Sequence, residues 1–251
     1  METDATAPRR PAREPQDRGT ATSAHRPSLT ADPAVARYVR TAGIAGAAST
    51  SIYLWLQLDV LGSRVFGNFY DIQARAFLDG HLDVPAGSLG NEAFAVRGQE
   101  FLYNPPGPSL LRLPLFLVTD RFDGRLTALS MLVAYGVTVV LLSLLVWRVR
   151  CLLAPGEPLE RPEAVAIGTF LVAATAGSTL LYLGAVPWVF HEAYAWAIAM
   201  SVGVAHALIG LLRRPSVTGV LATAGFTLGA VLSRTTAGFA CAAAVIAAGL
   251  W

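Results

Sequence analysis

Lysine is absent from this chain of 251 residues, so all 19 of its basic side chains are arginines. A phosphate-binding loop of the Walker type needs a lysine, and so does an enzyme that holds pyridoxal phosphate as a Schiff base. Both classes are therefore excluded. Charge of either sign is also scarce, because charged residues make up 14% of the chain, against roughly 25% in soluble domains. With a hydrophobic content of 54%, this scarcity indicates a membrane protein.

Cysteine is nearly absent as well. Cys151 and Cys241 lie far apart and show no metal-binding or redox spacing, so no disulfide framework is expected. Each is expected in or near the membrane, where a cysteine packs as a small hydrophobic residue. The net charge of +2, without basic residues interleaved with aromatic ones, argues against nucleic acid as a partner.

Long apolar runs dominate the chain after a polar tail. Residues 1–40 carry seven arginines and little apolar surface, so we expect a disordered cytoplasmic tail. A helix needs about 20 apolar residues to cross a hydrocarbon core of ~30 Å. The predicted fold class is all-α, a polytopic transmembrane helical bundle. Its predicted spans are residues 41–61, 126–147, 164–183, 193–212, 217–232 and 237–251.

The placement of arginine predicts the orientation of these spans. Arginines gather in the tail, between the second and third spans, and after the fourth, whereas residues 184–192 have none. This pattern indicates a multi-pass protein of the plasma membrane with a cytoplasmic N-terminus. Residues 62–125 then form a long outer loop. The chain stops at Trp251, directly after an apolar run, as expected of an N-terminal fragment whose transmembrane domain is incomplete.

The outer loop is expected to be ordered. Residues 69–79 show helical periodicity, with Asn68 as the N-cap and Gly80 as the stop. Residues 109–118 are apolar but too short to span, which favours a second helix at the membrane surface. The run Tyr103-Asn104-Pro105-Pro106-Gly107-Pro108 between them is expected to be extended and stiff.

Several polar residues near this outer face are candidates for a site, and each has a plainer interpretation. Asp71 could pair with Arg75 one helical turn away, or favour the positive end of the helix dipole. Glu92 could be a solvated acid in the loop. Glu192 follows His191 where the fourth span begins, and it too could serve the helix dipole.

Two residues inside the apolar part of the chain are also unusual. Arg234 separates the fifth and sixth runs, where it could pair with an acid or a lipid phosphate, or simply reach the interface. His206 lies in the middle of the fourth span, where a hydrogen bond between helices is favoured over a catalytic role.

The segments FYDIQARAFLDGHLDVP, NPPGPSLLRLP and FHEAYAWAIA, within residues 41–251, carry a resemblance. The chain resembles the GT-C superfamily of multi-spanning membrane glycosyltransferases, in an actinobacterial branch related to protein mannosyltransferase-like enzymes. The resemblance implies transfer of a hexosyl or pentosyl group from a polyprenyl-phosphate donor. It implies a glycan, lipid or protein acceptor in the cell envelope, with membrane lipids around the protein.

The resemblance also implies roles for individual residues. Asp71 matches the aspartate of the first outer loop, which acts as general base on the acceptor hydroxyl. Glu192, with His191, matches the second acidic position and would hold the acceptor or a divalent cation. The donor phosphate would be neutralised by an arginine. The remaining candidates for substrate binding are Arg75, Glu92, Tyr103 and Arg234.

Two other functions remain open from the sequence. A transporter or lipid-carrier flippase would use the interrupted fifth and sixth runs as a broken helix, with a site near the bilayer midplane. A truncated, non-catalytic remnant is the other alternative. Convergence of Asp71, Glu192 and Arg234 on one outer cavity would favour transfer, and convergence around His206 would favour transport.

Overall fold

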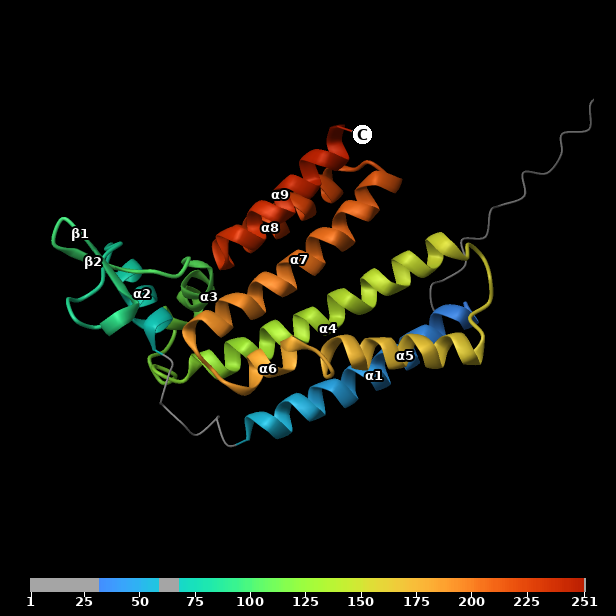
Figure 1. The fold of residues 1–251 in the computed structure, drawn as a ribbon, viewed down its shortest axis with the longest axis horizontal. Coiled ribbons are helices and arrows are strands. Elements are labelled where there is room, and N and C mark those ends of the chain that lie inside the picture. Colours follow the sequence, from blue (N-terminus) through green and yellow to red (C-terminus); the bar gives the residue numbers. More distant parts are fainter. Residues whose placement is uncertain (1–31, 59–67, 251) are drawn as a thin grey trace, which may run out of the picture.

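The computed structural model describes residues 32–58 and 68–250, and these residues are mostly helical. Long helices lie side by side, and a small folded unit covers one end of them (Figure 1). The elements in chain order are α1 (Pro33–Gln57), α2 (Phe69–Leu78), the 3-10 helix η1 (Gly90–Glu92), β1 (Ala93–Val96), β2 (Gln99–Leu102), α3 (Gly107–Phe116), α4 (Leu126–Leu153), α5 (Arg161–Thr175), α6 (Thr179–Ala185), α7 (Val189–Arg213), α8 (Val217–Ser233) and α9 (Thr235–Leu250).

The predicted helical class is confirmed, and the predicted spans are found in part. Among the described residues, α4 and α7 are long and apolar enough to cross a membrane. The pair α5 and α6 is a third candidate, although it is bent by 44°. Helices α8 and α9 are apolar but have only 17 and 16 residues. Six spans therefore stay a prediction, and residues 59–61 and 251 lie outside the described part.

Two helix boundaries differ from the predicted ones for local reasons. Helix α1 begins at Pro33 rather than near residue 41, because the Asp32 carboxylate accepts the N–H of Ala34 at 2.8 Å and caps it. The rest of the predicted tail, residues 1–31, lies outside the described residues. The predicted third span breaks after Thr175, and the Ser178 hydroxyl starts α6 by accepting the N–H of Leu180 at 3.2 Å.

The predicted outer loop contains a folded platform, residues 69–116, built from α2, a β-hairpin and α3. Strands β1 and β2 pair antiparallel around a tight turn at Arg97 and Gly98, whose φ angles are 52° and 82°. Helix α2 ends as predicted before Gly80, which has a φ of +80°. Asn68 is the N-cap residue of α2, as predicted, but its side chain makes no capping hydrogen bond, so the predicted role of that side chain is wrong.

The platform rests on the helical bundle through α2 and α3. Tyr70 and Ala76 of α2 pack with Val189 and Ala193 of α7 in one buried cluster. The predicted extended run ends early, because Gly107 already begins α3. A Cβ on Gly107 would lie 2.6 Å from the carbonyl oxygen of Leu232, so only glycine allows this contact between α3 and the end of α8.

Helices α8 and α9 form a tight corner beside the platform. Arg234 alone separates them, in an extended conformation with φ −155° and ψ 115°. A Cβ on Gly238 would come within 2.3 Å of the Cα of Val231, so the two helices touch through their backbones. The end of α8 and the start of α9 therefore pack tightly together, and Gly107 contacts this corner at Leu232.

The opposite end of the bundle is rich in arginine. The first turns of α1 and α5 and the last turns of α4 and α7 lie there, away from α2 and α3 (Figure 1). The end regions of these helices and the residue that follows α7 carry Arg37, Arg40, Arg148, Arg150, Arg161, Arg213 and Arg214. The described helices thus have one end covered by the platform and one basic end.

Candidate active site

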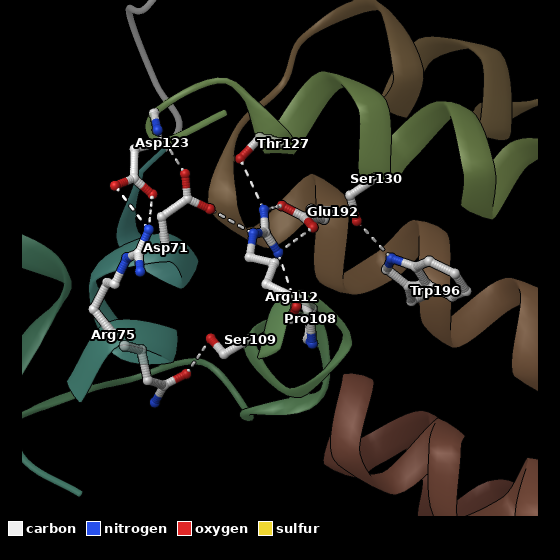
Figure 2. A network of polar contacts seen from close by, with 12 residues as sticks. Asp71, Arg75, Pro108, Ser109, Arg112, Asp123, Thr127, Ser130, Glu192 and Trp196 are labelled. Atoms are coloured by element: carbon white, nitrogen blue, oxygen red, sulfur yellow. Dashed lines mark hydrogen bonds and ion pairs between the residues drawn. The ribbon is translucent and has the colours of Figure 1, made fainter. Parts of the chain in front are cut away.

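The guanidinium of Arg112 joins two acids that lie far apart in the sequence. Arg112 belongs to α3, whereas Asp71 and Glu192 lie in the first turns of α2 and α7 (Figure 2). Its Nε donates to Oδ1 of Asp71 at 2.6 Å. Its Nη1 and Nη2 donate to the two oxygens of Glu192 at 2.7 and 2.9 Å. All three residues are buried, Glu192 completely, so one cation ties three helices together.

The other hydrogen bonds of this network leave no free donor on Arg112. Nη1 also donates to the carbonyl of Pro108 at 2.9 Å, and Nη2 to the hydroxyl of Thr127 at 3.2 Å. The second oxygen of Asp71 accepts the backbone N–H of Gly124 at 2.8 Å. A planar guanidinium has five N–H donors in a fixed fork, and this site uses them all.

The charges of the network do not cancel, because one cation faces two acids. Burial raises the pKa of the Asp71 carboxyl, and Arg112 and the Gly124 amide offset this rise only in part. Burial by itself lowers the pKa of the Arg112 guanidinium, but Glu192 and Asp71 outweigh it, so that pKa is raised. A buried carboxylate with an elevated pKa is a better proton acceptor than a solvated one.

Tyr70, next to Asp71, presents a buried hydroxyl to the same charges. Its oxygen has no hydrogen-bond partner among the described residues. Burial raises the pKa of the phenol; Glu192 raises it further and Arg112 and Arg234 lower it, with a smaller contribution from Glu92. The Arg112 guanidinium also lies 5.3 Å from the centre of the ring. Two acids and two arginines therefore act electrostatically on this unsatisfied hydroxyl.

The expected pairing of Asp71 with Arg75 is wrong. Arg75 instead forms ion pairs with Asp120 and Asp123 of the loop before α4, the latter at 3.0 Å. This pair is partly exposed, and the Arg75 guanidinium also covers the ring of Phe116 at 4.1 Å. Arg75 thus fastens the loop above Asp71 instead of neutralising Asp71.

The other predicted residues are spread around the network. His191 is buried, and its Nδ1 lies 2.6 Å from the carbonyl of Val186, among the rings of neighbouring aromatic residues. Glu92 accepts a long hydrogen bond of 3.4 Å from Asn104. Tyr103 is 75% exposed and contributes nothing to the buried network. Arg234 stacks on Tyr194 of α7, 3.8 Å from the ring centre.

A ligand set for a divalent cation is not apparent at Glu192. Both of its oxygens are taken by Arg112. Within residues 32–58 and 68–250 there is no group of three or more histidine, cysteine or acidic side chains that could hold a metal ion. Glu192 was expected to hold either the acceptor or a cation. In this part of the chain, no second metal ligand supports the cation.

Arg112 is the residue that sequence reasoning missed. The signal was present, because Arg112 interrupts the apolar segment SLLRLPLFLV and a lone arginine in such a segment must find a partner. Nothing in the segment itself says that the partners come from α2 and α7. Comparisons with models of protein families, with curated proteins and with solved structures find no match for this chain. The function must therefore be inferred from the site.

Proposed function

We propose that this chain is an integral membrane glycosyltransferase that takes a hexosyl or pentosyl group from a polyprenyl-phosphate donor. The acceptor is a glycan, lipid or protein hydroxyl at the outer face of the plasma membrane. The observation that carries the proposal is the buried contact of Asp71 and Glu192 with Arg112, where a folded platform meets apolar helices long enough to span a membrane.

The proposed reaction needs a proton acceptor and a way to hold charge in a dry site. The acceptor oxygen attacks the anomeric carbon, its proton passes to Asp71, and the bond from the anomeric carbon to the phosphate oxygen breaks. The phosphate leaves with the electron pair, so no strong acid is needed. The elevated pKa of Asp71 suits this role. Release of the Gly124 amide from Asp71 frees one carboxylate oxygen for the acceptor hydroxyl.

Arg112 and Glu192 act in this proposal as positioning residues. Arg112 holds Asp71 at a fixed distance from α7, and the paired hydrogen bonds with Glu192 fix the plane of the guanidinium. The free hydroxyl of Tyr70 can donate a hydrogen bond to a sugar or phosphate oxygen. Arg234, beside Tyr194, supplies a further positive charge near the same place for the donor phosphate.

The arrangement favours transfer over transport. The acids meet at the end of the bundle next to the platform, whereas a transport site is expected near the bilayer midplane. His206 is well removed from them, because it lines a cavity of about 640 Å³ with Arg148, Arg213 and Arg214 at the basic end. The positive-inside rule predicts a cytoplasmic position for this basic end, and that prediction supports an outer position for the acids.

The test compares transfer of labelled sugar from polyprenyl-phosphate donors in membranes containing the wild type, Asp71→Asn or Arg75→Met. The control, Arg75→Met, removes an arginine of α2 that pairs with loop acids rather than with the network. We expect transfer to vanish in Asp71→Asn and to persist in the control, with equal amounts of inserted protein. Activity that survives in Asp71→Asn removes the base assignment. Absence of transfer from every donor tested overturns the proposed function.

A further inference from the structure

A groove between α1 and α5 lies outside the candidate active site. It has a volume of about 970 Å³. Its walls follow one stripe of each helix, from the first turns at the basic end toward the platform. The residues that line it are Arg37, Arg40, Thr41, Ile44, Ala45, Ala48 and Ile52 of α1, and Arg161, Ala164, Val165, Gly168, Thr169, Val172, Ala173, Ala176 and Gly177 of α5 and the turn after it.

The charged groups of the groove are concentrated at one end and are positive. Arg37, Arg40 and Arg161 lie there, and no carboxylate lines the groove in the described part of the chain. Arg37 donates to the carbonyl of Leu159 and makes no ion pair with a described acid, although it also lines a neighbouring cavity together with Asp32, Glu157 and Glu160. Arg40 and Arg161 have neither an ion pair nor a hydrogen bond to any described side chain. Three arginines and no described acid line this end of the groove, which favours an anion there.

The rest of the groove is apolar and faces outward. Alanine and glycine line it with small side chains, which leaves the groove open, while Ile44 and Val165 project beside it with two thirds of their surface exposed. From Arg161 to Ala176 the helix rises about 22 Å. That exceeds half of the ~30 Å hydrocarbon core, so the groove can follow a lipid chain through one leaflet. An ion alone would leave this apolar surface uncovered.

We propose that the groove binds an anionic phospholipid of the arginine-side leaflet, with its phosphate on Arg37, Arg40 and Arg161 and an acyl chain along α1 and α5. The charge at one end and the apolar length behind it match the two parts of such a lipid. The site requires that α1 and α5 lie in a membrane, and it does not depend on the proposed sugar transfer. Basic pockets between membrane helices recognise lipid headgroups in this way.

The first experiment measures how much phosphatidylglycerol stays on the protein purified from nanodiscs of phosphatidylcholine and phosphatidylglycerol. The variant Arg40→Gln/Arg161→Gln removes the two arginines of the groove that have no ion pair or hydrogen bond to a described side chain. Its matched control, Arg213→Gln/Arg214→Gln, removes the same charge from the same end of the bundle, outside the groove. We expect binding to fall roughly 30-fold in the first variant and to remain in the control. Equal losses would mean general surface attraction and would overturn the site.

A second variant tests the acyl chain. Ala48→Phe fills the apolar part of the groove without changing any arginine. We expect it to retain less phosphatidylglycerol than the wild type, with the same helical content by circular dichroism. Unchanged retention in Ala48→Phe would show an anion site without a lipid chain. So would stabilisation of the wild type by inorganic phosphate in phosphatidylcholine nanodiscs that equals its stabilisation by phosphatidylglycerol. Either result would overturn a phospholipid as the occupant.

Discussion

Replacing Arg112 by methionine is the sharpest test of the buried network. Methionine fills much of the same volume but leaves two buried acids, Asp71 and Glu192, without a cation. Breaking a buried ion pair by removing one partner costs about 3–5 kcal/mol. Here the removed partner serves two acids, so we expect a loss of unfolding free energy at the upper end of that range. The Pro108 carbonyl and the Thr127 hydroxyl also lose a donor.

The assay is chemical unfolding in detergent micelles, followed by the fluorescence of tryptophan, since Trp196 lies in the same part of α7 and donates to Ser130 at 2.9 Å. Arg75→Met is the matched control, because its partly exposed ion pairs should contribute no more than about 1 kcal/mol. Arg112→Lys keeps the charge but offers three donors where five are used, so it should fall between the two.

Additivity decides whether the three residues act as one unit. In a double-mutant cycle, Asp71→Asn combined with Arg112→Met should cost less than the sum of the two single changes, because the second change no longer strands Asp71. A free energy for Arg112→Met equal to that of Arg75→Met would refute the reasoning. Strict additivity of the cycle would refute it as well.

Three further predictions concern single positions. The pKa of Asp71 is raised in the folded chain, so its favourable contribution to the free energy of unfolding is complete below the ordinary aspartate pKa of about 3.9 and is lost as pH rises through the folded value. In unfolding curves, the stability of the wild type relative to Asp71→Asn should therefore fall as pH rises over that window. A difference that rises with pH would contradict the sign of the shift. Gly107→Ala should destabilise the fold through its contact with Leu232, whereas Gly136→Ala, which meets nothing within 4 Å, should be neutral or stabilising by up to about 1 kcal/mol in the same assay. Tyr194→Leu should cost about 1 kcal/mol through loss of the stacking with Arg234, and an equal cost in an Arg234→Gln background would show that the stacking contributes nothing.

Hydrophobic runs of sufficient length made the long helices predictable. Helices α4 and α7 come from apolar runs long enough to cross a membrane, where a helix satisfies all backbone hydrogen bonds within the segment. The break between α5 and α6 was missed, because alanine, glycine, serine and threonine are compatible with a continuous apolar helix. The hairpin of β1 and β2 was missed too, since its turn is Arg-Gly rather than the asparagine-glycine pair that marks such turns.

The two acids of the network were predicted, but the way they are paired was not. Spacing along α2 placed Arg75 next to Asp71, and local spacing was the only geometry that the sequence offered. In the fold, Asp120 and Asp123 approach Arg75 from the loop before α4, while Arg112 reaches Asp71 from α3. Such pairings depend on how helices distant in sequence dock, which no short segment specifies.

The contact of Gly107 with Leu232 connects α3 mechanically to the corner between α8 and α9. One end of this ten-residue helix touches the backbone of the corner between α8 and α9, and a turn and a half further along it carries Arg112. Because α3 is short, a small tilt of the corner would shift the Arg112 guanidinium, which lies between Asp71 and Glu192. A change in the position of this corner would therefore reach the contact of Asp71 and Glu192 with Arg112 through one short helix.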